Sequence, residues 1–150
     1  MTPLARATLL GAAAGAAGTT ALNAVTYLDM AVRGRPASST PEDTVGRVAD
    51  AAGLHVRGEE RLEGLGSLSG LLAGVGTGAA LGFLRGAGLR AGPLRWSALA
   101  TVAALLVGNG PMTALGVTDP RRWSALDWAS DVVPHLAYGA VTGYVLDRLG

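Results

Sequence analysis

Long stretches without charged side chains are the feature that most constrains how this chain folds. Residues 7–32 contain a single charged side chain, Asp29, and residues 65–84 and 96–117 contain none. At about 1.5 Å per residue, a helix of any of these lengths crosses the roughly 30 Å hydrocarbon layer of a membrane. That layer offers no water to backbone amides, so a segment inside it has to be helical. The sequence therefore predicts membrane-spanning helices.

A fourth stretch, residues 125–147, is predicted to span as well, although it contains Asp127, Asp131, Pro134 and His135. The predicted fold class is all-α, an integral membrane four-helix bundle with a short amphipathic loop helix, in one transmembrane domain covering residues 1–150. An aqueous loop is predicted at residues 33–63. The four predicted spans are residues 7–32, 64–85, 95–116 and 125–147.

Composition excludes several classes of function. The chain is 49% hydrophobic and only 15% charged, unlike an ordinary soluble domain. Its net charge of +1, with no basic run interleaved with aromatics, gives no reason to expect a nucleic-acid partner. With no cysteine, a disulfide framework and thiol chemistry are excluded. The partner that the composition indicates is the lipid bilayer.

The first predicted span has a rival interpretation. Arg6 precedes an apolar stretch, and Ala14, Gly15 and Ala16 supply the small-residue pattern of a signal-peptide cleavage site. The apolar stretch, however, continues to Val32, well beyond the about 7 to 15 residues of a signal-peptide core. Its length favours an uncleaved span.

The aqueous loop contains one predicted helix. Residues 39–43 combine hydroxyl groups, a proline and two acids, the pattern of a helix N-terminus, and Gly53 can end the helix. An apolar face with helical spacing is formed by Val45, Val48, Ala49 and Ala52. We expect this helix to lie on the membrane surface or against the bundle, and docking of a partner protein is the alternative.

Several residues mark the boundaries of the spans. Ser124 and Asp127 form a variant of the capping box that starts the last span. Pro111 lacks a backbone donor and is expected to bend the third span or end its regular part early. Asp29 and Arg33 are predicted to form an i, i+4 ion pair at the membrane surface. Interfacial aromatics are predicted at three positions near span entrances: Trp96, Trp123 and Trp128.

The second span contains a glycine at every fourth residue. Such spacing puts the glycines on one face, where the missing side chains let another backbone approach closely, as in a glycine zipper. The other spans contain small residues at the same spacing, so internal packing is favoured over a homo-oligomer seam. The members of this glycine ridge are Gly66, Gly70, Gly74, Gly78, Gly82 and Gly86.

Polar side chains inside the predicted spans are few, and they are the default place to look for function because lipid makes them costly. At about 1.5 Å per residue, Asn23 and Asn109 lie roughly 5 Å past the midplane of their spans, and Asp131 lies roughly 7 Å toward the same side. His135 falls near the middle, with Asp131 and Tyr138 on the same face of the fourth span. We predict that these five residues form one intramembrane polar cluster, with Asp131 and His135 paired.

Two interpretations of this cluster remain open. The first is a structural clamp in an accessory component of a membrane complex, whose partner is another membrane protein or a second copy of the chain. The second is a small proton- or solute-conducting transporter or channel in which His135 titrates beside Asp131. An enzyme is not expected, because this pair lacks a third metal ligand or a second carboxylate and His55 lies in the loop. No catalytic residue, cofactor or metal site is predicted.

The predicted orientation follows from the arginines. An even number of spans places both termini on one face, together with the short, acid-free loop that holds Arg85, Arg90 and Arg95. This face has five Arg and the other has seven, but several of the seven lie in the longer, acidic loop. Because Arg density beside the spans is highest in the short loop, we predict cytoplasmic termini in a multi-pass plasma-membrane protein.

Three features of the sequence support a family resemblance. They are the run Ala-Gly-Thr-Thr-Ala-Leu-Asn at residues 17–23, the Pro41-led helix, and His135 with Gly139, Gly143 and Tyr144 in the last span. Together with the four-span outline, which covers most of the length, the chain resembles small uncharacterised bacterial inner-membrane proteins of the YagU-like kind. The resemblance implies a membrane location and a helical fold. It implies no substrate and no catalytic motif.

Overall fold

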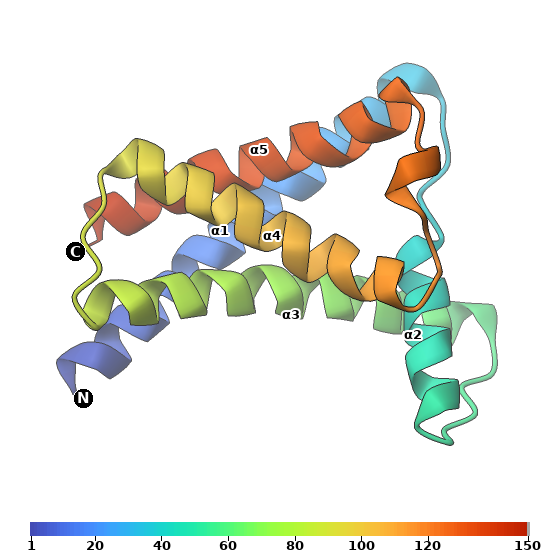
Figure 1. Cartoon of the computed structure of the whole chain (residues 1–150), viewed down its shortest axis with the longest axis horizontal. Coiled ribbons are helices and arrows are strands. Elements are labelled where there is room, and N and C mark those ends of the chain that lie inside the picture. The colour runs from blue at the N-terminus through green and yellow to red at the C-terminus, as the bar shows by residue number, and fades with distance from the viewer. Residues whose placement is uncertain (150) are drawn as a thin grey trace.

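The structure, a computed structural model, describes residues 1–149, and every regular element in this range is helical (Figure 1). The predicted all-helical class is confirmed. Each predicted span coincides with a long helix to within a few residues, and the aqueous loop contains the predicted short helix. The elements are α1 (Pro3–Arg33), α2 (Thr40–Ala51), α3 (Glu59–Gly86), α4 (Pro93–Ala114), the 3₁₀ turn η1 (Pro120–Arg122) and α5 (Ala125–Arg148).

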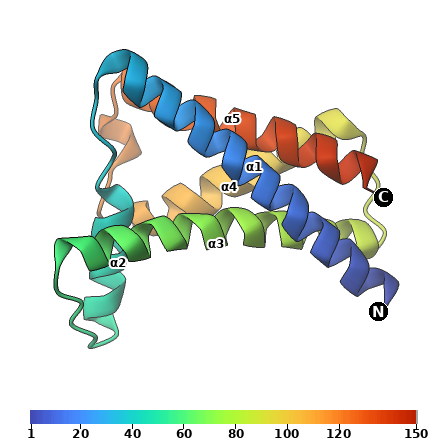
Figure 2. The same ribbon diagram turned by 180° about the vertical axis from the view of Figure 1, so that it is seen from behind.

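The four long helices pack along one another and alternate in direction (Figures 1 and 2). Both termini and the α3–α4 connection lie at one end of the molecule, which we call the termini end. The short helix α2, the α1–α2 connection and η1 lie at the other end, which we call the α2 end. Helix α1 packs against both α3 and α5, α5 packs against α4, and α2 lies against α3.

Local sequence signals explain where the helices begin and end. The Thr2 hydroxyl accepts a hydrogen bond from the amide of Ala5 at 3.2 Å, and Gly34, with φ of 64°, terminates α1 in the left-handed conformation. At the start of α5, the Ser124 hydroxyl accepts from the amide of Asp127, and the Asp127 carboxylate accepts from the amide of Ser124. The predicted capping box is therefore confirmed.

Two expectations about the ends of the spans differ from the structure. Of the two effects expected of Pro111, a bend or an early end, the early end is wrong: α4 continues to Ala114, because the proline removes one backbone donor without breaking the following turn. Trp96 is not an interfacial aromatic, because it is only 1% exposed and packs in the core with Leu146 and Ala100. Trp123 and Trp128 do lie together near the α2 end, with ring centroids 5.0 Å apart in an edge-to-face contact.

The core of the bundle is thin and is built largely from small residues. The exposed surface of the molecule is 8987 Å², whereas a folded soluble monomer of 15.0 kDa exposes about 7,000 Å². Large apolar side chains therefore remain on the outside of the helices. The buried hydrophobic residues of the core cluster are Ala14, Leu81, Trp96, Ala100, Ala104, Tyr138 and Leu146.

Helices α3 and α4 are long and apolar enough to cross a membrane. Only 22% of the apolar window of α3 and 11% of that of α4 is buried inside the molecule. Most of the apolar surface of these two windows therefore lies on the outside of the molecule. The other two long helices contain no window of equal mean hydropathy, because Gly, Thr and Asn23 interrupt the apolar residues of α1 and α5 contains Asp131 and His135.

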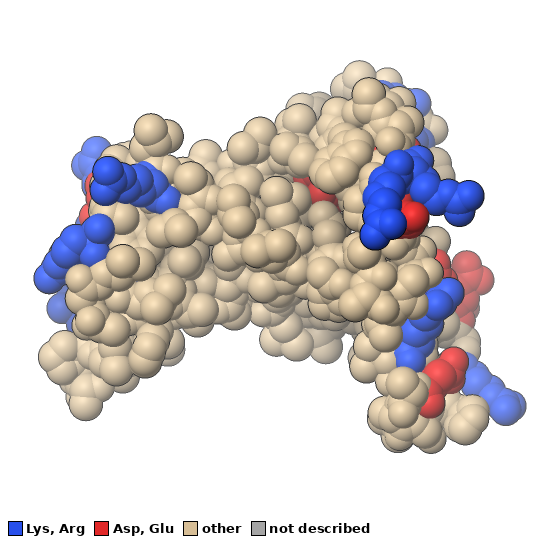
Figure 3. Space-filling view, viewed as in Figure 1, with Lys and Arg blue, Asp and Glu red and all other residues tan. Residues whose placement is uncertain are grey.

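Charged side chains gather at the two ends of the molecule and leave its middle largely uncharged (Figure 3). We call the uncharged middle the apolar band, made of residues 7–28, 64–84, 96–114 and 128–146 of the long helices. Asp131 is the one charged residue in the band. Its surroundings therefore define the candidate site.

Candidate functional site

Asp131 of α5 is held by a residue of the neighbouring helix. The amide nitrogen Nδ2 of Asn109, on α4, donates a hydrogen bond to Oδ2 of Asp131 at 2.8 Å. The Asp131 side chain is 18% exposed, so the group is only partly shielded by the bundle. This contact joins α4 to α5 in the half of the apolar band nearer to the α2 end.

His135 lies one helical turn after Asp131. Its Nδ1 lies 2.7 Å from the backbone oxygen of Asp131 and 3.6 Å from the carboxylate atom Oδ1 of the same residue. A carbonyl oxygen accepts only, so Nδ1 carries a proton and the ring is oriented by the backbone. The other ring nitrogen, Nε2, faces α4, where a Cβ added at Gly108 would lie 3.7 Å from it. Nε2 of His135 makes no hydrogen bond to any of residues 1–149.

Tyr138 points away from this group, toward α3. Its side chain is fully buried, and its hydroxyl donates to the backbone oxygen of Gly74 at 2.7 Å. Thr142, one turn later, is also fully buried, and its hydroxyl donates to the backbone oxygen of Ala14 on α1 at 3.4 Å. Both hydroxyls therefore bind other helices, and neither extends the Asp131–His135 pair.

The structure brings three of the five predicted cluster residues together: Asn109, Asp131 and His135. Tyr138 belongs to a separate contact, and Asn23 is half-buried on α1 without a side-chain hydrogen bond to any of residues 1–149. The rise per residue predicts how deep each side chain lies along its helix. It does not predict the direction in which the side chain points around the helix axis, and that direction decides which side chains meet.

The glycine ridge divides between two neighbouring helices. Gly74, Gly78, Gly82 and Gly86 face α1, and a Cβ added at Gly78 would lie 2.4 Å from the backbone oxygen of Gly11. Gly66 instead faces the start of α2, where an added Cβ would lie 3.0 Å from the amide nitrogen of Glu42. Around Gly70, no atom lies within 4 Å of such a Cβ. Four of the six ridge positions therefore pack inside the chain against α1.

A second close contact, between α4 and α5, involves residues that sequence reasoning missed. A Cβ added at Gly139 would lie 1.8 Å from the Thr101 hydroxyl, and one added at Gly143 would lie 2.3 Å from the amide nitrogen of Ser97. Ser97 and Thr101 are four residues apart on α4. That spacing of small hydroxyl residues was the signal that could have identified them, as it does in membrane helix pairs.

A network of charged residues fastens the end of α1 to the start of α5. Asp29 binds both Arg33, with Nε to Oδ1 at 2.6 Å, and Arg35, with Nε to Oδ2 at 2.7 Å. Arg33 also donates to the Ser130 hydroxyl at 2.5 Å. The predicted Asp29–Arg33 pair is confirmed, and the hydrogen bonds that Arg33 donates to the Asp29 carboxylate raise the pKa of Arg33.

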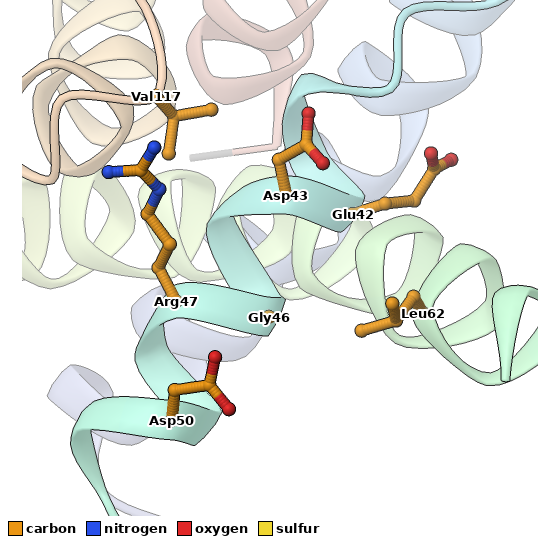
Figure 4. A pocket seen from close by; sticks show the side chains of 7 residues that line it. All are labelled: Glu42, Asp43, Gly46, Arg47, Asp50, Leu62 and Val117. Atoms are coloured by element: carbon orange, nitrogen blue, oxygen red, sulfur yellow. The ribbon is translucent and has the colours of Figure 1, made fainter. Parts of the chain in front are cut away.

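A groove lies at the α2 end, outside the apolar band (Figure 4). Its volume is about 380 Å³, and Arg47 crosses one side of it to donate to the backbone oxygen of Leu115 at 2.7 Å. In residues 1–149, no three His, Asp or Glu side chains converge as a metal site would require. The groove is lined by Glu42, Asp43, Gly46, Arg47, Asp50, Leu62 and Val117.

Comparison with known proteins gave no family assignment. A scan against protein-family models, a search of curated proteins and a search of solved structures found no match.

Proposed function

We propose that the chain is a multi-pass plasma-membrane protein in which α1, α3, α4 and α5 all span the bilayer. The observation that carries this proposal is the apolar band, which encircles the four long helices and contains Asp131 as its one charged residue. The exposed apolar windows of α3 and α4 support it, because contact between such a large apolar surface and water has an unfavourable free energy. Spontaneous solubility of the full chain without detergent would contradict it.

The function that the candidate site supports best is that of a structural or accessory component of a membrane complex. Asn109 donates a hydrogen bond to the carboxylate of Asp131, and the Tyr138 hydroxyl donates one to the backbone of α3. Groups engaged in this way fasten helices together, as interhelical hydrogen bonds do in membrane bundles. Under this proposal the polar residues act as a clamp, and a partner is another membrane protein or a second copy of the chain.

The clamp is tested by purifying the full chain in a mild detergent after chemical cross-linking in native membranes. We expect a partner of fixed stoichiometry to co-purify with the wild-type chain. We also expect Asn109→Ala to lower the unfolding temperature. A chain that purifies alone and keeps its unfolding temperature after this substitution would contradict the accessory role.

A second function, proton or solute conduction, is favoured by one specific observation. Asp131 and His135 are the one acid and the one histidine of the apolar band, and both are partly exposed, at 18% and 15%. Intramembrane ionisable residues with access to the surface often mark ion pathways. Liposomes containing the wild-type chain would then show pH-dependent flux. Asp131→Asn would abolish the flux without changing the unfolding temperature, whereas loss of stability alone would favour the clamp.

We further propose that the termini face the cytoplasm. Five Arg and one acid lie at the termini end, whereas seven Arg are mixed with nine acids at the α2 end. A reporter fused after the last residue should therefore be active in the cytoplasm, and activity on the opposite side would reverse the orientation. The YagU-like resemblance agrees with a membrane location and stays a prediction.

A further inference from the structure

The termini end of the molecule is strongly basic. The short connection between α3 and α4 has an Arg on either side and one within it, and the two chain ends contribute one Arg each. Figure 3 shows this basic surface at the end opposite α2. Its arginines, which we call the arginine end, are Arg6, Arg85, Arg90, Arg95 and Arg148, with Asp147 as the one acid nearby.

The positive charges of the arginine end are not paired with acidic side chains among residues 1–149. Within residues 1–149, none of its five guanidinium groups forms a salt bridge, whereas at the α2 end Arg33 and Arg35 both bind Asp29. Arg148 lies over the ring of Tyr144, at 5.0 Å from the centroid, a contact that leaves its positive charge uncompensated. Among residues 1–149, this end therefore concentrates five arginines with Asp147 as the one acid beside them.

Exposed apolar side chains lie next to these arginines in the sequence. Leu94 is 82% exposed between Arg90 and Arg95, and Leu89 is exposed next to Arg90. The connection turns at Gly88, whose φ of 109° a residue with a side chain rarely adopts. Arginine next to exposed leucine at the edge of an apolar band suits the boundary between headgroups and acyl chains, where leucine enters the lipid and guanidinium binds phosphate.

We propose that the arginine end binds the phosphate headgroups of anionic glycerophospholipids. A guanidinium group presents paired N–H donors that match two phosphate oxygens. A lipid of net negative charge also neutralises the positive charge of the arginine end, which a zwitterionic lipid does not. We expect no such preference at the opposite end, because its seven arginines are interleaved with nine acids. This inference rests on the proposed membrane location and adds to it the class of lipid recognised.

The experiment uses the full chain in detergent, incubated with equal amounts of phosphatidylglycerol and phosphatidylcholine of identical acyl chains. Native mass spectrometry then counts each lipid retained. We expect the wild-type chain to retain several-fold more phosphatidylglycerol. Each Arg near an anionic surface contributes roughly fivefold, so the triple variant Arg85→Gln, Arg90→Gln, Arg95→Gln should lose at least about fivefold of this preference. The matched control is Arg57→Gln, Arg61→Gln, Arg121→Gln at the α2 end, which should keep it.

Equal retention of the two lipids by the wild-type chain, or an unchanged preference in the triple variant, would overturn the inference. Helical circular dichroism and size-exclusion profiles of the variants show whether each is folded, and the single substitution Arg90→Gln, in the exposed connection, provides the comparison if the triple variant is not. The two proposals fail separately. A chain that needs detergent but has no lipid preference refutes only the arginine-end proposal, whereas a chain soluble in buffer refutes the membrane location.

Discussion

The contact of α1 with α3 and the contact of α4 with α5 hold the same bundle together by different means. Where α1 meets α3, Gly11 and Gly15 lie against Gly78 and Gly82, so backbone touches backbone. Where α4 meets α5, Gly139 and Gly143 lie against Thr101 and Ser97. In the same contact, Asn109 donates a hydrogen bond to Asp131. We call these the glycine contact and the polar contact.

The difference predicts which substitutions each contact tolerates. Dispersion over a close backbone approach stabilises the glycine contact, so any added atom separates the helices. The polar contact has in addition the hydrogen bond from Asn109 to Asp131, and the Thr101 side chain in it can rotate when space is lost. Substitutions that add volume should therefore damage the glycine contact most, whereas substitutions that remove polar groups should affect only the polar contact.

The largest effect is expected from Gly78→Ala. The new Cβ would lie 2.4 Å from the backbone oxygen of Gly11 and 2.5 Å from the Cα of Gly15, and backbone atoms cannot rotate away. We expect a loss of about 3 kcal/mol in the free energy of unfolding, the upper range for overpacking. Unfolding followed by circular dichroism in detergent measures it. The matched control is Gly70→Ala, which meets no atom within 4 Å and should be neutral or stabilising.

A smaller loss is expected from Gly139→Ala in the polar contact. The added Cβ would lie 1.8 Å from the Thr101 hydroxyl, which can rotate, and 2.6 Å from the backbone oxygen of Ser97, which cannot. We expect about 2 kcal/mol from the same unfolding measurement. Combining the change with Thr101→Ala should recover part of the loss. A loss equal to that of Gly78→Ala, without any recovery, would erase the distinction between the two contacts.

Removing the hydrogen-bond donor of the polar contact should have a moderate effect. Asn109→Ala leaves the Asp131 carboxylate without its partner on α4, and we expect a loss of about 1 kcal/mol. A double-mutant cycle with Asp131→Ala isolates the pairwise energy, which averages about 0.6 kcal/mol for such bonds in membrane bundles. A coupling energy of zero would remove the argument that Asn109 and Asp131 form a clamp.

The smallest effect is expected from Tyr138→Phe, which tests the hydroxyl that reaches from α5 to α3. The substitution keeps the buried ring and removes only the hydrogen bond to the backbone oxygen of Gly74. Because that oxygen is a helical carbonyl with its own intrahelical donor, we expect a loss of about 0.6 kcal/mol. A loss above that of Gly78→Ala would mean that this hydroxyl, and not the glycine contact, positions α3.

Much of the architecture could be predicted because it depends on local signals. The ends of the apolar stretches, the capping box of Ser124 with Asp127 and the proline-led start of α2 specify the helices without tertiary information. The Asn109–Asp131 contact also followed partly from sequence, since antiparallel helices place residues of equal depth side by side.

The remaining features depend on how each helix is rotated about its axis. Asn23 has a suitable depth, but its side chain makes no hydrogen bond to the residues described. Tyr138 shares a helix face with His135 yet reaches a different helix. Trp96 has the position of an interfacial aromatic but points into the core. Rotation is set by close packing at Gly139, Gly143, Ser97 and Thr101, and such packing leaves only a weak periodic trace in a small-residue sequence.

The central claim is that the apolar band lies in lipid, and introduced cysteines test it directly because the chain has none of its own. Leu106 is 68% exposed on α4 within the band, and Ser38 is exposed in the α1–α2 connection. In unsealed membranes, a charged maleimide should label Ser38→Cys rapidly. It should leave Leu106→Cys unlabelled until the membrane is dissolved and the chain denatured. Equal labelling of both positions before that step would contradict the account.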